Sequence, residues 1–213
     1  MMDVLLLADL HGNYGKVDAF LGYDYDAVII AGDITNFGPL EPVESLLSSF
    51  EVPCFAIPGN CDPREIVDVL ERSDAVCLHN SWISLGKVTF AGLGGSNKTP
   101  FDTPFELTEE EIDKELARIV RYMERNVHNV LISHAPPYKT LDTVGANHVG
   151  SQSIRKHMTG FDLVCCAHIH EARGITTADG VTIVNPGPAS DGYGALIHFG
   201  NEPKEIRIDL ISV

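Results

Sequence analysis

The chain has 213 residues, of which 44% are hydrophobic and 21% charged, so a disordered or fibrous protein is excluded and one folded domain over residues 1–213 is expected. Thirty acidic residues against fifteen basic ones give a formal net charge of −15. Such a charge repels phosphate backbones, which argues against duplex nucleic acid as a partner.

The cysteines and the N-terminal segment favour a cytoplasmic protein. The five cysteines form an odd set without metal-finger spacing, and two of them are neighbours in an apolar run, which indicates reduced thiols. The first apolar stretch ends at Asp9, which is shorter than the core of a signal peptide. No other run is long enough to span a bilayer, so no membrane association is expected.

Five short apolar runs divide the chain. Their Val, Ile and Leu content, with apolar residues on both faces, is typical of buried strands in a mostly parallel α/β sheet. Segments of helical length separate several of them. The runs cover residues 4–8, 27–31, 54–57, 130–132 and 163–167.

Other patterns predict a helix and added antiparallel strands. Residues 82–92 resemble a hairpin. Thr108 and Glu111 form a capping box, and apolar residues then recur at helical spacing up to Met123. A second hairpin turns on Asp179 and Gly180, and residues 205–211 alternate as a half-solvated strand does.

A side chain able to bind a metal follows each of the five apolar runs within a few residues. Because the carboxyl ends of parallel strands share one edge of a sheet, these side chains are expected to meet in one crevice. If strand geometry continues, the pairs Asp9 with His11 and His168 with His170 each point to one side. The full set is Asp9, His11, Asp33, Asn60, His134, His168 and His170.

The chemistry of this set favours two metal ions. It contains oxygen and imidazole donors, no thiolate, and about twice the donors that one ion needs, which suits Mn, Fe, Co, Ni or Zn better than Ca or Mg. A lone Asp after a strand is usually a helix cap or turn residue, and a lone His usually lies on the surface or in the core. These ordinary explanations would have to hold independently at all five strand ends, which argues against them.

Five short motifs in this order resemble the calcineurin-like metallophosphoesterase superfamily, in the predicted phosphoesterase branch that carries GNC where most members carry GNH. The resemblance implies a four-layer α/β/β/α sandwich, in which two mixed sheets are flanked by helices. The motifs are DLH at 9–11, GD at 32–33, GNCD at 59–62, SHAPP at 133–137 and AHIH at 167–170.

The resemblance also implies roles for the residues. Asp9, His11 and His170 would hold one metal ion, Asn60, His134 and His168 the other, and Asp33 would bridge them. The implied reaction is hydrolysis of phosphodiesters or activated phosphomonoesters, by attack of a hydroxide that bridges two divalent metals, with manganese favoured. Asp33 and His134 are then catalytic as well as metal-binding, and the partner is a small phosphate ester.

Cys61 departs from the family pattern, because it stands where members usually carry a histidine that stabilises the transition state or protonates the leaving group. A thiol near its ordinary pKa is a neutral, weak donor. Three interpretations remain: a structural thiol in a branch that works without this acid, another residue that supplies the proton, or a scaffold that has lost catalysis. His148, in a polar segment flanked by glycine, is the candidate for the second.

The sequence gives less information about substrate specificity than about the metal site. Asn13, Asn60 and Asn97, which lie in the LHGN, GNCD and GGSN segments, are candidates for substrate binding. The alternative function is a non-catalytic metal-binding scaffold of the same fold that acts in protein interaction. The sequence leaves the substrate, the native metal and the oligomeric state open.

Overall fold

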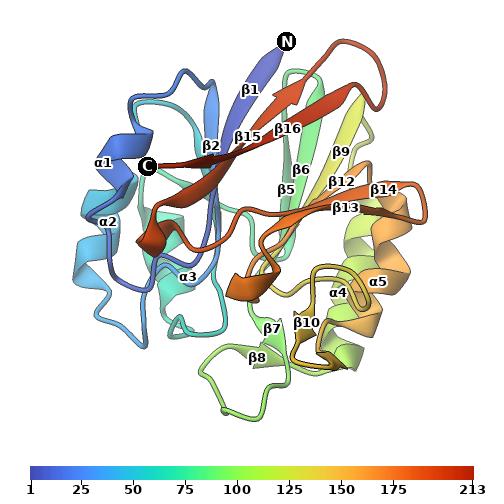
Figure 1. Ribbon diagram of the computed structural model, residues 1–213, viewed down its shortest axis with the longest axis horizontal. Helices are drawn as coiled ribbons and strands as arrows, with labels where there is room; N and C mark the ends of the chain where they lie inside the picture. The colour runs from blue at the N-terminus through green and yellow to red at the C-terminus, as the bar shows by residue number, and fades with distance from the viewer.

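Two six-stranded sheets face each other in the computed structural model, which describes residues 1–213 (Figure 1). The first sheet has the strand order β16-β15-β1-β2-β3-β4. Its strands are β1 Met2–Leu7, β2 Ala27–Ala31, β3 Cys54–Ile57, β4 Val76–Cys77, β15 Tyr193–Phe199 and β16 Ile206–Ser212. Strands β1 to β4 are parallel, whereas β15 runs antiparallel to both β1 and β16.

The second sheet has the order β13-β14-β12-β9-β6-β5. Its strands are β5 Ser81–Leu85, β6 Val88–Leu93, β9 His128–Ser133, β12 Leu163–Cys165, β13 Gly174–Ala178 and β14 Val181–Asn185. The four central strands are parallel and the edge strands β5 and β13 are antiparallel. Both hairpins predicted from the sequence are therefore confirmed, and both sheets are mixed.

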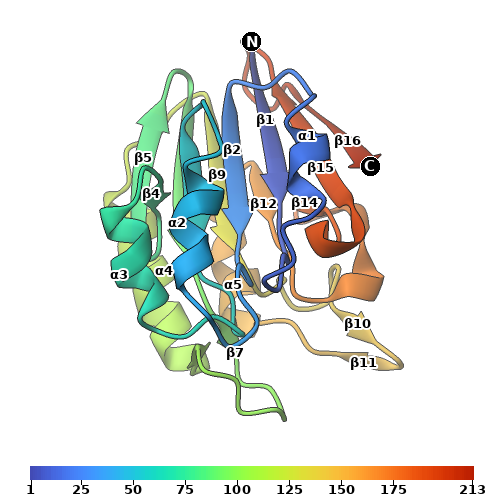
Figure 2. The same ribbon diagram turned by 90° about the vertical axis from the view of Figure 1, so that its left-hand side faces the viewer.

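Five helices cover the outer faces of the sheets. They are α1 Val17–Phe20, α2 Glu41–Leu47, α3 Ile66–Arg72, α4 Glu109–Tyr122 and α5 Gln152–His157. The first three lie on the first sheet, and α4 and α5 lie on the second (Figure 2). The capping box of α4 forms as predicted, since Thr108 Oγ1 accepts from the Glu111 N–H and the Glu111 carboxylate accepts from the Thr108 N–H. None of these helices has the length and apolarity to cross a bilayer.

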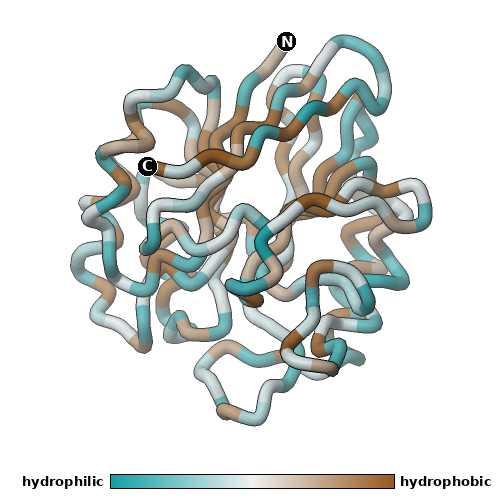
Figure 3. The backbone as a smooth tube through the Cα atoms, viewed as in Figure 1, coloured by the Kyte–Doolittle hydropathy of each residue, from teal (hydrophilic) through white to brown (hydrophobic).

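Alternation along β1 explains the layering. Val4 and Leu6 pack into the core between the two sheets, whereas Leu5 and Leu7 pack against the helices α1 and α2. A strand covered on both faces must be apolar at every position, which is why the run is continuous rather than alternating. The central strands are accordingly brown in Figure 3. The four-layer α/β/β/α sandwich is confirmed.

Two small two-stranded sheets lie beyond the carboxyl ends of the parallel strands, at the lower end of the molecule in Figure 1. They pair β7 Ser96–Asn97 with β8 Glu106–Leu107, and β10 Thr143–Val144 with β11 Asn147–His148. Hydrogen bonds tie the β10–β11 hairpin to its surroundings: the Val149 N–H donates to the Asp142 carbonyl, and Asn97 Nδ2 donates to the Val149 carbonyl. These segments form walls beside the strand ends.

Candidate metal centre

The segments that follow the parallel strands turn through left-handed backbone conformations. Asp9, His11, Asp33 and His168 have φ angles of 53°, 48°, 49° and 70°. Non-glycine residues rarely adopt this region, and clusters of them are typical of functional sites. Backbone hydrogen bonds hold the turns after β1 and β2 together, because the His11 N–H donates to the Asp33 carbonyl at 2.8 Å.

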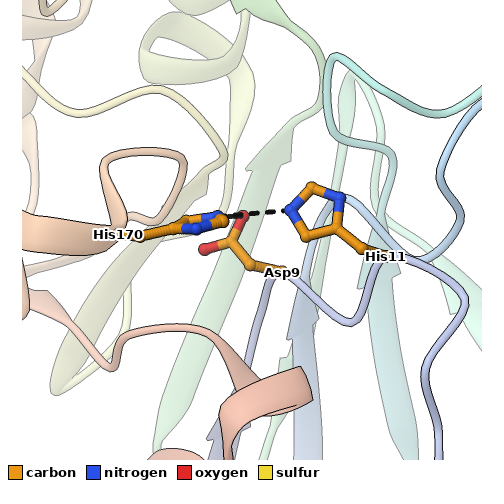
Figure 4. A group of neighbouring side chains, drawn as sticks. All are labelled: Asp9, His11 and His170. Carbon is orange, nitrogen blue, oxygen red and sulfur yellow. Dashed lines mark hydrogen bonds and ion pairs between the residues drawn. The ribbon is translucent and has the colours of Figure 1, made fainter.

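Asp9, His11 and His170 form the first group of potential ligands, whose donor atoms lie within 4.8 Å of one another (Figure 4). His11 Nε2 and His170 Nε2 are 3.2 Å apart, and His170 Nε2 is 3.6 Å from Asp9 Oδ1. Asp9 is fully buried, and its Oδ1 has no hydrogen-bond partner. A buried carboxylate oxygen without a donor is costly, so this atom fits a metal ion.

Asp33, His134 and His168 form the second group, also within 4.8 Å. His134 is fully buried and its Nδ1 donates to the Ala31 carbonyl at 2.9 Å, which directs Nε2 into the site. There Nε2 lies 3.0 Å from Asn60 Oδ1. The hydrogen bond to the carbonyl fixes the ring orientation, as is usual for metal-binding histidines.

Asp33 of the second group also lies close to the first group. Its Oδ2 is 3.7 Å from His11 Nε2 and 3.4 Å from His134 Nε2, while its Oδ1 accepts from the Cys61 N–H at 2.8 Å. Asp33 Oδ2 therefore lies close to one histidine of each group. This position fits a carboxylate that contacts two metal ions.

His168 and His170 do not point to one side as the strand spacing predicted, because the two residues belong to different groups of potential ligands. The prediction assumed that strand geometry continues after β12. Instead, the backbone at His168 is left-handed and a 3₁₀ turn begins at His170, so the side chains separate toward the two halves of the site. Asp9 and His11 do share a group, through turns rather than through extended backbone.

Charge coupling shifts the pKa values in this site. Burial alone would lower the pKa of His134, but Asp33 and Asp9 raise it to about 9, so a metal ion would displace the Nε2 proton when it binds. Burial opposes ionisation of Asp33, yet His134 and His11 hold the pKa of its carboxyl below the ordinary range. Burial and the neighbouring His134 lower the pKa of His168 to about 4, which keeps that imidazole neutral, as a metal ligand must be.

Comparison with known proteins decides the family. The model of the calcineurin-like phosphoesterase family matches residues 2–172. The chain belongs to this family. An uncharacterized protein of Methanocaldococcus jannaschii is 41% identical over 202 residues, a match that covers 89% of each chain.

Solved structures share the calcineurin-like phosphoesterase fold at low sequence identity. TT1561 of Thermus thermophilus has a TM-score of 0.70 at 17% identity, with 98% of each chain covered. A dimetal phosphatase of Danio rerio has a TM-score of 0.64 at 12% identity, covering 99% of this chain and 98% of that one. An archaeal phosphodiesterase has a TM-score of 0.54 at 16% identity, covering 99% and 100%. These likenesses concern the fold.

Residues that the sequence reasoning did not single out position the potential ligands of this calcineurin-like phosphoesterase. Asn60 Nδ2 donates to Thr103 Oγ1 at 3.1 Å, and Thr103 Oγ1 donates to the Glu106 carboxylate at 2.8 Å. The buried Asp62 carboxylate accepts from the backbone of Ile34, Thr35 and Gly59, which ties the β2 and β3 turns together. Asp62 stands in the GNCD motif, whereas no local pattern marks Thr103.

Cys61 lies against the centre. Its sulfur, His11 and Asp33 have donor atoms within 4.8 Å of one another. Burial and the Asp33 charge raise the pKa of the Cys61 thiol, so the thiol is neutral at physiological pH. The position therefore holds a weak donor and not a charged acid.

The remaining candidate residues, Asn13, Asn97 and His148, lie in two different places. Asn97 and His148 line a pocket of about 470 Å³ that also includes His168. Asn13 is exposed, lies outside that pocket and donates from Nδ2 to the Ser190 carbonyl at 3.3 Å, so it fastens a loop.

Proposed function

We propose that the chain is a di-metal phosphoesterase that hydrolyses small phosphodiesters, or phosphomonoesters with good leaving groups. The position of Asp33 Oδ2 carries this proposal, because it lies between one histidine of each donor group. Asp9, His11 and His170 would hold one ion, and Asn60, His134 and His168 the other. The mixed oxygen and nitrogen donors suit manganese, and also Fe, Ni, Co or Zn.

The chain's own residues would prepare the site for an anionic substrate. Two bound divalent cations would polarise the phosphate oxygens and activate a water for in-line attack on phosphorus. Asp9 and Asp33 concentrate negative charge at the strand ends, which attracts those cations in the first place. The carbonyl of Ala31 keeps His134 Nδ1 protonated, so that Nε2 is the nitrogen available to a metal.

Both ester classes have support among the relatives. One similar fold is described as a phosphodiesterase and another as a dimetal phosphatase. The net charge of −15 supports a small ester over duplex nucleic acid. The five free cysteines support action in the reducing cytoplasm.

Metal-dependent hydrolysis tests the proposal. The purified protein is assayed with bis-p-nitrophenyl phosphate and p-nitrophenyl phosphate in EDTA and with Mn, Ni, Co, Zn or Mg. We expect stimulation by Mn, and the ratio of the two rates decides between diester and monoester preference. No turnover with any metal would contradict the proposal.

Asp33→Ala should lower kcat at least about a hundredfold, because it removes a charged group that both halves of the site share. Elemental analysis should show less bound metal in the variant. Asp113→Ala is the control, since that aspartate lies on α4 and pairs with Lys156 and His157 outside the site. An unchanged rate in Asp33→Ala would refute the assignment.

Cys61 favours one other function, a metal-binding scaffold without catalysis, because the usual acid position holds a neutral thiol. Two metal ions bound per chain, with neither ester hydrolysed, would support that function.

A further inference from the structure

A pocket adjoins the candidate metal centre on the side of the β10–β11 hairpin. Its volume is about 470 Å³, and His168 of the second donor group forms part of its wall. Phe101, Tyr138, Val144 and Val149 give it aromatic and aliphatic surface. A pocket of this size and lining accommodates the organic part of a small substrate.

His148 lines the same pocket and is held by a buried carboxylate. Its Nδ1 lies 2.7 Å from Asp142 Oδ1, and its ring packs edge-on against Tyr138 with centroids 5.8 Å apart. Asp142 Oδ2 accepts from the Lys139 and Gly150 N–H groups at 2.9 and 3.0 Å. Because Asp142 occupies Nδ1, the nitrogen left for another molecule is Nε2.

Burial of the carboxylate distinguishes this pair from the other histidine–aspartate pairs outside the metal centre. The Asp142 side chain is 0% exposed, whereas Asp113 beside His157 is 39% exposed, and Asp3 and Asp209 beside His198 are 33% and 45% exposed. A buried carboxylate that also fixes two backbone N–H groups orients an imidazole far more firmly than a solvated one. Such an arrangement is typical of a histidine that transfers protons.

We propose that this pocket binds the leaving-group part of the phosphoester, and that His148, positioned by Asp142, protonates the leaving oxygen. The inference rests on the proposed function and deepens it. The pocket would favour diesters whose leaving alcohol carries an aromatic or aliphatic group. Protonation by His148 would favour alcohols whose alkoxides are poor leaving groups. It also assigns the acid that Cys61 does not provide.

In this step the ester bond breaks as His148 gives up a proton. The attacking water releases one proton to solvent and its oxygen bonds to phosphorus, while the bond from phosphorus to the leaving oxygen breaks. The electron pair of the broken bond stays on the leaving oxygen, which takes the proton from Nε2 of the His148 imidazolium. The neutral imidazole then regains a proton from solvent, which reaches it because the side chain is 40% exposed.

Leaving-group dependence tests the role of His148. Wild type, His148→Ala and His148→Gln are compared on bis-p-nitrophenyl phosphate and diphenyl phosphate, whose phenol leaves less readily and needs the acid more. We expect kcat for diphenyl phosphate to fall about a hundredfold or more in both variants, and that for bis-p-nitrophenyl phosphate less than about tenfold. Metal content per chain should match wild type.

His157→Ala is the matched control, because it removes a histidine paired with Asp113 at 2.8 Å outside the pocket. Both rates should stay at wild-type level in this variant. Equal losses on the two diesters in His148→Ala, no loss, or a wild type that hydrolyses only bis-p-nitrophenyl phosphate would overturn the role of His148 alone. A wild type that hydrolyses neither diester would overturn the proposed function, and this inference with it.

Asp142 is a positioning residue, and its test does not need turnover. In metal-free protein labelled with ¹⁵N-histidine, NMR at a pH where the ring is neutral should place the His148 proton on Nδ1. Asp142→Asn should give a mixture of tautomers, since the amide offers a donor as well as an acceptor. A proton on Nε2 in the wild type would overturn the positioning role.

Discussion

A single amide orientation decides whether Asn60 presents an oxygen or a nitrogen to the metal centre. Its Nδ2 donates to Thr103, which leaves Oδ1 directed toward His134 Nε2. Thr103 accepts this bond because its own hydroxyl proton is committed to the buried Glu106 carboxylate. The hydrogen bonds that link Glu106, Thr103 and Asn60 therefore direct the Asn60 side-chain oxygen toward the metal centre, and oxygen is the amide atom that binds cations.

Thr103→Val should lower metal affinity about 10- to 100-fold, because the variant removes the acceptor that orients Asn60 while it keeps the shape of the side chain. Competition with a chromogenic chelator measures the affinity.

Thr99→Val is the matched control, since Thr99 also donates to Glu106 but has no hydrogen bond to Asn60. Equal affinities of wild type and Thr103→Val would show that Thr103 does not orient Asn60.

The turns after β2 and β3 approach each other so closely that only glycine fits between them. A Cβ on Gly59 would overlap the Asp33 backbone nitrogen and its carboxylate. The glycine before Asn60 thus permits the close approach in which the Cys61 N–H donates to Asp33 Oδ1. In the same turn, Asp62 accepts the Gly59 N–H at 2.8 Å.

Gly59→Ala should destabilise the fold by about 1 to 3 kcal/mol and lower metal content, because the added methyl group has no space beside Asp33. Chemical denaturation and elemental analysis measure the two effects.

Gly86→Ala is the comparison, since its φ of +55° makes alanine unfavourable but nothing lies within 4 Å of the new Cβ. The Gly86→Ala variant should lose about 1 kcal/mol of folding free energy and keep its bound metal. Full metal occupancy in Gly59→Ala would contradict the steric argument.

The elements differ in how far their sequences reveal them. Continuous apolar runs locate the buried strands, and parallel pairing of β1 with β2 then brings Asp9 and Asp33 to one edge, so their proximity was predictable. His134 was expected at the same edge, but it follows a strand of the second sheet, so its approach depends on how the two sheets pack. The family resemblance implied the division of His168 and His170 between two groups, whereas their spacing did not, because the division depends on a left-handed residue and a 3₁₀ turn. Likewise, the contact of Asp142 with His148 depends on how one loop folds back on itself, which leaves no periodic signal.

At the scale of the whole molecule, the centre lies where the two sheets converge and receives donors from both. Asp9, Asp33 and Asn60 follow strands of the first sheet, and His134 and His168 follow strands of the second. Metal ions held there would link the two sheets. Unfolding would separate the donors, so metal binding favours the folded chain.

Metal addition should therefore raise the melting temperature. A metal concentration of 100 times Kd adds about 2.7 kcal/mol to the free energy of unfolding. For a chain of this size, that corresponds to a rise of roughly 5 to 11 °C in the melting temperature. Calorimetry with Mn, followed by excess EDTA, measures the shift and its reversal.

Asp33→Ala should abolish most of this shift, and Asp113→Ala should keep it. A shift that persists in Asp33→Ala would indicate that the metal stabilises the protein from another site.

The antiparallel pairing of β15 with β1 sets an order for assembly on the ribosome. β1 emerges first, and β2 and β3 can join it on one side, but the other side pairs Met2 with Phe199 and Leu6 with Ala195. The Ala189 N–H likewise donates to the Ala8 carbonyl, directly before Asp9. A nascent chain that has made all seven potential ligands still lacks the strand that holds the first of them in place. The metal centre is therefore completed late in synthesis, when β15 pairs with β1.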